Sequence, residues 1–341
     1  MNNTFLALSA DDRQLALDDA ALRLGTDPVI LEKDFWVSWL LGLLFTLPDI
    51  APHLVFKGGT SLSKVFGVTD RFSEDIDLCL VPEFVGADAV GFDELTSRVK
   101  RDAAVLEMQR LCAEKAKAVV LPLLDQAIAE HLGASPAGAW LRYELDADSK
   151  SPIIYFGYPS GQRGGFAYLA REVKLELGTL TDQQPTEVHP VRPLLADAFP
   201  ALFDDWACSV RALALQRTFW EKATILHAEF HRPSESPTPD RYARHYFDMV
   251  KLLRHPQAGA FLADTTQCAR VVNWKSRVFA RGWARYDLAQ PGSFRLLPAE
   301  ARQAALAQDY ATMRPMFMSE PPPFAALMQT LAATENTLNN A

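Results

Sequence analysis

The sequence contains little cysteine and no long uninterrupted hydrophobic run, and both absences narrow the class of protein. Its four cysteines are far apart and form no C-x-x-C pair, which favours reduced thiols over a disulfide framework or a zinc site. The longest apolar stretch, residues 35–47, is interrupted by Ser38 and Thr46 and is too short to span a bilayer. The first residues also lack the basic and apolar regions of a signal peptide. We therefore expect a cytoplasmic protein that does not associate with a membrane.

The sequence also lacks the excess of positive charge that is typical of general nucleic-acid binders. Its formal net charge is −8, but this charge is unevenly distributed. Residues 1–210 contain 18 Lys/Arg and 31 Asp/Glu, a net of −13, whereas residues 211–285 contain 13 and 6, a net of +7. Such an asymmetry is compatible with an acidic metal-binding half and a basic half that contacts phosphates. It is equally compatible with an ordinary solvated helical surface.

The length and composition predict a well-packed protein of two domains or of one elaborated domain. With 341 residues, 49% of them hydrophobic, the chain can bury a full core. The first part reads as mixed helices and strands, and almost everything from residue 205 onward reads as helix. A proline-rich run over residues 185–200 reads as a connection. We expect domains over residues 1–200 and 201–341, with strands over residues 54–57, 75–80, 140–145, 153–158 and 171–177.

The segment Phe56-Lys57-Gly58-Gly59-Thr60-Ser61-Leu62 combines a glycine pair with the predicted start of a helix. Glycines let main-chain N–H groups approach a polyphosphate closely, and the positive end of a helix dipole favours an anion. Taken alone, a glycine pair before a threonine is more typical of a turn with a helix N-cap.

The segment over residues 71–78, Arg-Phe-Ser-Glu-Asp-Ile-Asp-Leu, places two acidic residues on a predicted strand. Asp75 and Asp77 are two residues apart and therefore share one face, while Ile76 and Leu78 face the core. A lone pair of this kind is usually a solvated strand edge. After a glycine pair and a helix, however, it predicts paired oxygen ligands beside a phosphate-binding turn, as Mg²⁺-dependent phosphate chemistry requires.

Together, FKGGTSLSKVF and RFSEDIDL resemble the signature of the AbiEii/AbiGii-type nucleotidyltransferase toxins, a branch of the DNA polymerase β-like nucleotidyltransferase superfamily. Between Gly59 and Asp75 lie 15 residues, slightly more than the usual spacing, which suggests a longer helix or turn. The resemblance extends to REVKLELG and to RTFWEKATILHAEF and RYARHYFDMVKLL, and so covers most of residues 30–255. It implies an α/β fold, in which a small mixed, mainly antiparallel nucleotidyltransferase sheet with flanking helices precedes a helical C-terminal domain.

The same resemblance assigns roles to residues on the predicted strand over residues 171–177. Glu172, Lys174 and Glu176 share one face of that strand. Relatives take a third carboxylate from a neighbouring strand, which implies that Glu176, or alternatively Glu172, completes the metal site or accepts the proton of the attacking hydroxyl. Lys174 would lie near phosphate. The pattern alone also fits an exposed strand face with unrelated charges.

Relatives further have a lysine followed, some twenty or more residues later, by an aspartate, and Lys222 and Asp248 match this arrangement. The resemblance implies that Lys222 binds the triphosphate and that Asp248 acts near the acceptor. The residues alone leave other interpretations open. Lys222 could pair with a surface acid, and Asp248 could form a salt bridge with Arg244 or Lys251 at helical neighbour positions.

The implied reaction transfers a nucleoside monophosphate from an NTP to an acceptor and releases pyrophosphate. Two Mg²⁺ ions would be held by Asp75, Asp77 and Glu176, and the triphosphate would contact Gly58, Gly59 and the hydroxyl of Thr60 or Ser61.

The resemblance also implies a toxin of a toxin–antitoxin or phage-defence pair, with a cognate antitoxin protein as partner and the 3′ end of tRNA as acceptor. Two alternatives remain: a toxin that nucleotidylates a protein hydroxyl, or a catalytically idle nucleotidyltransferase fold used for binding. The clustered acids argue against the idle fold, because like charges destabilise a protein unless a cation compensates them.

Overall fold

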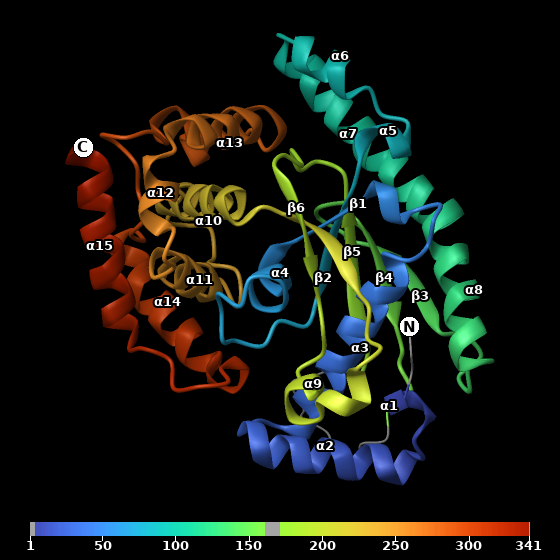
Figure 1. Ribbon diagram of the computed structural model, residues 1–341. Coiled ribbons are helices and arrows are strands. Elements are labelled where there is room, and N and C mark those ends of the chain that lie inside the picture. Colours follow the sequence, from blue (N-terminus) through green and yellow to red (C-terminus); the bar gives the residue numbers. More distant parts are fainter. Residues whose placement is uncertain (1–3, 161–170, 341) are drawn as a thin grey trace. The chain divides into compact units, whose positions relative to one another are not determined.

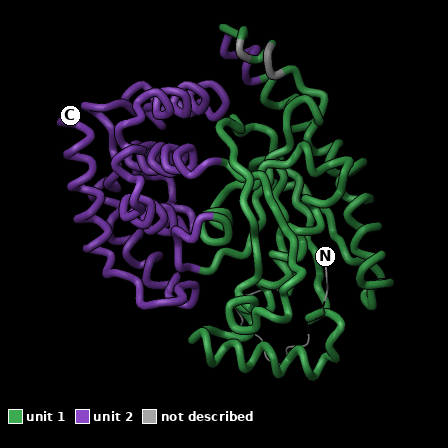
Figure 2. The backbone as a smooth tube through the Cα atoms, in the orientation of Figure 1, with its two compact units in different colours: residues 1–65, 72–96, 103–213 green, residues 66–71, 97–102, 214–341 purple. Residues whose placement is uncertain are grey.

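The computed structural model of the protein describes residues 4–160 and 171–340. Its contacts divide the chain into two compact units (Figure 2). The first unit contains residues 1–65, 72–96 and 103–213, and the second contains residues 66–71, 97–102 and 214–341. A functional division after residue 200 stays a prediction. By its contacts, the first unit extends to residue 213, because its last segment is a strand of the sheet.

Within the described part of the chain, the first unit is built on a seven-stranded sheet in the order β3-β4-β5-β2-β1-β7-β6 (Figure 1). The expected α/β class is confirmed, but the sheet is mixed rather than mainly antiparallel. The strand β1 runs parallel to β7, and β2 runs parallel to β5, whereas the other neighbours are antiparallel. The strands are β1 (Leu54–Lys57), β2 (Ile76–Leu80), β3 (Leu141–Leu145), β4 (Pro152–Phe156), β5 (Val173–Gly178), β6 (Thr186–Pro190) and β7 (Ser209–Leu213).

The helix α3 (Pro28–Leu44) supplies much of the core of this unit. Asp27 caps it by accepting a hydrogen bond from the Val29 N–H at 2.8 Å, and Pro28 occupies the first turn, where its missing N–H costs nothing. Aromatic side chains of α3 then pack on residues of β4 and the segment after it. Trp39 stacks on Phe156 with ring centres 5.8 Å apart, and almost every residue of α3 is buried. Each such large side chain stabilises the fold by about 1.5–3 kcal/mol when fully buried.

The remaining helices of the first unit flank the sheet or connect its strands (Figure 1). A π-helical turn lies just before Pro122, and this proline occupies the first turn of the next helix. The helical elements are α1 (Thr4–Ala7), α2 (Ala10–Leu24), η1 (Ala51–His53), α4 (Gly58–Lys64), α5 (Pro82–Val85), α6 (Ala89–Glu94), α7 (Arg98–Lys115), η2 (Ala116–Val120), α8 (Leu121–Leu132), α9 (Leu195–Ala198) and η3 (Pro200–Phe203).

Two strands occur where the sequence predicts none. The proline-rich connection over residues 185–200 contains β6, and the part expected to be helical from residue 205 begins with β7. Both segments form strands because they pair with neighbouring strands. The strand β7 lies between β1 and β6, so its main-chain groups are hydrogen-bonded on both sides. The strand β6 lies at the edge of the sheet, where a terminal proline is tolerated. Short strands of this kind depend on their neighbours more than on their own propensity.

The second unit is helical. Its helix α10 (Leu215–Phe230) packs on α11 (Ala243–Leu253) and on α13 (Thr265–Val278), with Trp220 and Phe294 fully buried. The last helix, α15 (Phe324–Asn340), belongs to this unit, because Glu335 accepts hydrogen bonds from the N–H groups of Leu296 (2.6 Å) and Leu297 (3.0 Å). The other helical elements are α12 (Ala258–Ala263), η4 (Gly282–Ala284), η5 (Tyr286–Leu288), α14 (Glu300–Thr312) and η6 (Arg314–Met316).

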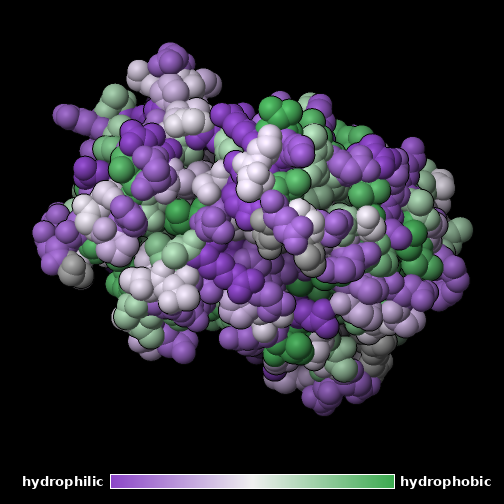
Figure 3. All heavy atoms as spheres, turned by 90° about the horizontal axis from the view of Figure 1, so that it is seen from above, coloured by the Kyte–Doolittle hydropathy of each residue, from purple (hydrophilic) through white to green (hydrophobic). Residues whose placement is uncertain are grey.

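The exposed hydrophobic residues are few and scattered. Leu22 and Val99 are the most exposed of the large ones, at 85% and 77%. On the face displayed in Figure 3, hydrophobic residues form small patches separated by hydrophilic ones. Among the described residues, no helix has both the length and the apolar character needed to cross a membrane.

Candidate functional site

The glycine pair lies where β1 ends and α4 begins. Gly58 adopts a positive φ of +84°, which favours glycine over any residue with a side chain. A Cβ atom at this position would lie 1.9 Å from Oδ2 of Asp77. The carboxylate of Asp77 therefore rests directly against the main chain of Gly58, and no larger residue fits between them. The antiparallel pairing of β1 with β2, in which Lys57 is opposite Asp77, explains this close approach.

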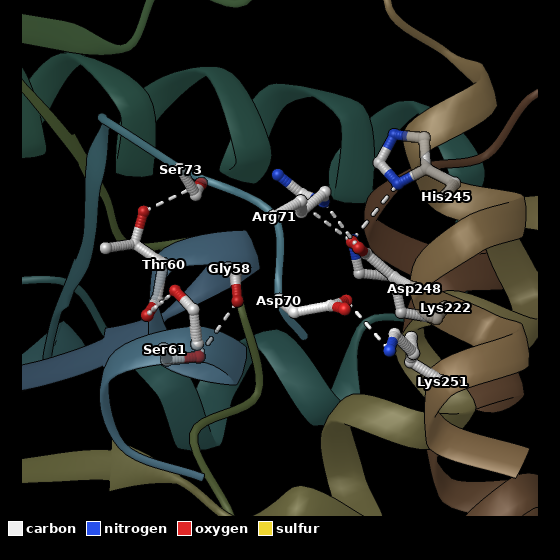
Figure 4. A network of polar contacts seen from close by, with 11 residues as sticks. Gly58, Thr60, Ser61, Asp70, Arg71, Ser73, Lys222, His245, Asp248 and Lys251 are labelled. Atoms are coloured by element: carbon white, nitrogen blue, oxygen red, sulfur yellow. Dashed lines mark hydrogen bonds and ion pairs between the residues drawn. The ribbon is translucent and has the colours of Figure 1, made fainter. Parts of the chain in front are cut away.

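The hydroxyl groups that follow the glycines are engaged inside the protein (Figure 4). Thr60 Oγ1 donates a hydrogen bond to the main-chain carbonyl of Asp75 and contacts the Ser73 hydroxyl at 2.9 Å. Ser61 Oγ donates to the Gly58 carbonyl at 2.9 Å. Both side chains are fully buried. These bonds fix the turn to the segment that enters β2, so both hydroxyls help to position the acidic strand.

Three of the predicted acids occupy two neighbouring strands. Asp75 immediately precedes β2, Asp77 lies within it, and Glu176 of β5 is directly opposite Asp77 in the parallel ladder. Directly opposed residues on paired strands point to the same face, so the Asp77 and Glu176 side chains share a face with that of Asp75. On the other face, Ile76, Leu78 and Leu175 are buried in the core.

The acids are close enough to perturb one another. The pKa of Asp75 is raised to about 6, first because burial penalises the charged carboxylate, and then because Asp77 and Glu74 repel it; Lys174 acts in the opposite direction. A carboxylate that remains partly protonated near pH 6 lacks a compensating cation. The donor set is therefore suited to a divalent cation, which prefers carboxylate oxygens.

Lys174 and Glu176 form an ion pair with each other on β5. Burial opposes the charge of Lys174, but the hydrogen bond to Glu176 and the negative charges of Glu176 and Asp75 together outweigh burial and raise the lysine pKa. Both side chains are about one-third exposed, at 30% and 38%. Glu172, the alternative third acid, contacts Arg142 at 3.3 Å instead. Of the two glutamates, Glu176 is the one directly opposite Asp77.

The described residues contain no closed group of three or more His, Cys, Asp or Glu side chains already arranged around a metal position. The pairing of Glu176 with Lys174 is consistent with this, because it draws one carboxylate of the set toward a cation of the protein. The close contact between the Asp77 carboxylate and Gly58, together with the raised pKa of Asp75, nevertheless fits a cation between the acids.

The charged residues of α3 support the acidic strand, and sequence patterns did not reveal them. Lys33 is buried and forms an ion pair with Glu74, the residue before Asp75. Asp34 is also buried; it pairs with Lys64 at 2.5 Å and accepts a hydrogen bond from the Leu194 N–H at 2.7 Å. Charges in the middle of a helix that is otherwise apolar are the only signal in the sequence for these contacts.

In the second unit, Lys222 and Asp248 are brought together as a buried ion pair (Figure 4). Lys222 Nζ lies 2.7 Å from Asp248 Oδ2 and 3.2 Å from Nδ1 of His245. Arg71 donates two hydrogen bonds to the same carboxylate, at 2.6 Å to Oδ1 and at 2.8 Å to Oδ2. Asp248 is therefore bound by residues distant in sequence, and neither Arg244 nor Lys251 is its ion-pair partner in the structure; Lys251 pairs with Asp70 at 2.8 Å.

The pKa values in this group reflect burial and mutual charge. Burial opposes ionisation of Asp248, but Arg71 and Lys222 outweigh it and hold its pKa well below the usual range. Burial lowers the pKa of Lys222, and Asp248 counteracts this effect. Burial and the neighbouring cations lower the pKa of His245 well below its usual value, so this imidazole is neutral at pH 7. A neutral Nδ1 can accept a hydrogen bond from the Lys222 ammonium.

The similarity of this chain to known proteins agrees with these features. No curated protein sequence matches it. Among solved structures it is similar to MenT4, nucleotidyltransferase toxin Rv2826c from Mycobacterium tuberculosis H37Rv, with 17% identity over 90% of this chain and 99% of that chain; the TM-score of 0.34 is too low to carry an argument. A family model, that of the nucleotidyl transferase AbiEii toxins of type IV toxin–antitoxin systems, matches residues 40–333. Because this match covers most of the sequence, the chain belongs to that family of nucleotidyltransferase toxins.

Proposed function

We propose that this toxin transfers a nucleoside monophosphate from an NTP to the 3′ end of tRNA in a Mg²⁺-dependent reaction, and that a cognate antitoxin protein restrains it in the cytoplasm. The observation that carries the proposal is the placement of Asp77 against Gly58 and opposite Glu176, with Asp75 on the same face. This arrangement puts a potential cation position beside a glycine turn whose main chain can approach phosphate. The family resemblance supports a role in phage defence.

Asp75, Asp77 and Glu176 are the residues that would hold Mg²⁺, two ions in the proposed complex. The metal would supply charge neutralisation on the phosphates and orientation of the triphosphate. The raised pKa of Asp75 supports this role, because a bound cation would favour its ionised form. Gly58 and Gly59 would contact the triphosphate through their main chain, while Thr60 and Ser61 keep the turn in place.

Lys174 and Lys222 are the proposed cations for the phosphates. Lys174 is about one-third exposed and pairs with Glu176, so arrival of a triphosphate gives it a second anion and frees Glu176 to bind metal or to accept a proton. Lys222 is held by Asp248, whose carboxylate is fully buried. We therefore assign Asp248 a positioning role, in which it orients Lys222, in place of a direct contact with the acceptor.

In the proposed reaction the acceptor hydroxyl oxygen forms a bond to the α-phosphorus, and the bond from that phosphorus to the bridging oxygen breaks. Pyrophosphate leaves with the bonding electrons, and Glu176 accepts the proton of the hydroxyl. The surplus positive charge of residues 211–285, a net of +7 from 13 Lys/Arg and 6 Asp/Glu, supports an acceptor rich in phosphate, such as RNA.

The test is incubation of the full-length protein with Mg²⁺, each of the four α-³²P-labelled NTPs in turn, and total tRNA. The Asp75→Asn/Asp77→Asn double variant serves as the control for the acidic site. Label on tRNA with the wild type alone supports the proposal and identifies the preferred NTP. Label on protein alone would retain the transfer chemistry but replace the acceptor, and label on neither would overturn the proposed reaction.

A further inference from the structure

The carboxylate of Asp248 is shared between two cations. Lys222 contacts only Oδ2, whereas Arg71 contacts both oxygens, at 2.6 and 2.8 Å. All three side chains are at least nine-tenths buried, with exposed fractions of 1% for Arg71, 6% for Lys222 and 0% for Asp248. A planar guanidinium that grips a carboxylate with two bonds is a strong and directional partner. Arg71 thus determines both the orientation of Asp248 and how much of its charge Lys222 experiences.

Arg71 is itself held in place by the main chain of the second unit. The N–H of Met318 donates to the Asp70 carbonyl at 3.0 Å, and Arg71 forms an antiparallel bridge with Phe317. The Asp70 side chain adds an ion pair with Lys251 at 2.8 Å and accepts a hydrogen bond from the Ser319 hydroxyl at 2.5 Å. Phe317 in turn packs on Phe247, one residue before Asp248, with ring centres 4.8 Å apart. These contacts fix Arg71 relative to α11, the helix that carries Asp248.

We propose that Arg71 is a positioning residue that keeps the Lys222 ammonium available to the triphosphate of the NTP by taking up most of the Asp248 carboxylate. The inference rests on the proposed function, in which Lys222 binds the triphosphate. Without Arg71, Lys222 is the remaining ion-pair partner of Asp248 among the described residues, and the pair tightens because charges attract strongly in a buried setting. When the whole charge of the Asp248 carboxylate acts on the Lys222 ammonium, this ammonium neutralises less of the charge on an incoming phosphate. With Arg71 present, Lys222 can bind a phosphate while keeping its single contact to Oδ2.

The neutral imidazole of His245 fits this arrangement. Its Nδ1 lies 3.2 Å from Lys222 Nζ and orients the ammonium without adding a negative charge that would compete with phosphate. Among the charged groups with the largest effect on the Lys222 pKa, Asp248 is an anion, and Arg71 and Arg244 are cations. Exchange of the Arg71 charge is therefore a direct way to alter the strength of the Lys222 ion pair.

The test compares Arg71→Met, which removes the charge at similar length, with Arg71→Lys, which retains it. Arg314→Met is the matched control, because Arg314 is 52% exposed and pairs with Glu320. Calorimetry would measure the binding of a non-transferable α,β-methylene NTP and of the corresponding nucleoside monophosphate to the full-length protein with Mg²⁺. We expect Arg71→Met to bind the triphosphate about tenfold more weakly, Arg71→Lys to remain within about threefold of the wild type, and monophosphate binding to change little. In turnover assays the KM for NTP should rise more than kcat falls.

Unchanged triphosphate binding by a folded Arg71→Met protein would overturn the inference. So would an equal loss with Arg71→Lys, since charge would then not be the property that matters. If Arg71→Met does not fold, as judged by circular dichroism, Arg71→Gln replaces it, because the amide can still donate one hydrogen bond to Asp248. The binding assay needs no turnover, so it decides this inference even where label transfer fails and the proposed reaction is rejected.

Discussion

In the first unit, Asp75, Asp77 and Glu176 are half-buried carboxylates that repel one another, whereas in the second unit Asp248 is a fully buried carboxylate between two cations. The pKa values move in opposite directions as a result. Burial and like charges raise that of Asp75 to about 6, while Arg71 and Lys222 hold that of Asp248 well below its usual range.

The difference indicates which group is suited to a metal ion. The charges around Asp248 are compensated by the protein itself, so this group is stable without any addition and can act as a rigid support. In the first unit, burial and like charges raise the pKa of Asp75, and Lys174, the cation that opposes this effect, forms a partly exposed ion pair with Glu176 that can be exchanged. A site that binds a metal and a triphosphate, and then releases product, needs charges that are incompletely satisfied in its absence.

The largest expected effect comes from removing Asp75 and Asp77, the two acids at the start of β2. Asp75→Asn/Asp77→Asn should lower nucleotidyl transfer by about 10³-fold or more, equivalent to about 4 kcal/mol of transition-state stabilisation. The same double variant should be at least as stable as the wild type in metal-free buffer, because it removes like charges. Label transfer and urea unfolding, measured on the same preparation, test both statements. A double variant that is less active and clearly less stable would indicate that these acids support the fold, and the comparison would fail.

Removal of the carboxylate from the Asp248 ion-pair group should instead destabilise the protein. Asp248→Ala leaves Arg71 and Lys222 buried without their shared anion, which should lower the free energy of unfolding by about 3–5 kcal/mol. Asp287→Asn provides the control, since Asp287 is 62% exposed in its pair with Arg285 and solvent-exposed pairs of this kind contribute little to stability. Urea unfolding at neutral pH measures both variants. Equal stability of Asp248→Ala and Asp287→Asn would contradict the assignment of the buried group as a support.

The sequence predicts the first of these regions much better than the second. The strands β1 and β2, the glycine turn between them and the shared face of Asp75 and Asp77 all follow from local pattern, and the structure confirms the strands. The alternation of Val173, Leu175 and Leu177 likewise predicts β5. Local spacing is sufficient because the side-chain period of a strand is fixed at two residues.

The second region could not be predicted because its contacts join distant parts of the chain. Arg71 and Asp248 are 177 residues apart. The contact that was missed in the first unit, between Lys33 and Glu74, likewise joins residues 41 apart. No spacing rule links such pairs, so helical neighbours of Asp248 appeared as its natural partners. The strands β6 and β7 were missed for a related reason, since their pairing, and not their own composition, determines their structure.

The pH dependence of the unfolding free energy tests whether the carboxylate of Asp75 destabilises the folded protein. Asp75 has a folded-state pKa of about 6 against 3.8 when unfolded, so the folded state binds its proton more tightly. Its charge therefore destabilises the protein fully above pH 6, by about 3 kcal/mol for a shift of about two units, and this penalty disappears as the pH falls toward 4. His227, whose pKa burial lowers to about 4, has the opposite effect below pH 6.5.

The quantity to measure is thus the difference in unfolding free energy between Asp75→Asn and the wild type, by urea titration at pH 5, 6 and 7.5 without divalent cations. Subtraction removes the contribution of His227, which both proteins share. The variant should gain most at pH 7.5 and only about half as much at pH 5. Mg²⁺ at pH 7.5 should reduce the gain by stabilising the wild type. A difference that does not vary with pH would show that Asp75 titrates normally.

The smallest expected effect comes from the turn that carries the acids. Gly58→Ala adds a Cβ that would meet Asp77 Oδ2 at 1.9 Å, so the carboxylate must move by at least about 1 Å to reach van der Waals contact. A displacement of that size lowers turnover by about 100-fold, because the acids no longer match the reacting groups.

Gly86→Ala is the matched control: its φ of +83° is nearly the same as the +84° of Gly58, yet no atom lies within 4 Å of its added Cβ. Both variants should lose about 1 kcal/mol of stability from backbone strain, and only Gly58→Ala should lose activity. Equal activity in the two variants would mean that the reaction does not require the contact between Asp77 and Gly58. The close approach of these two residues would then be a feature of packing alone.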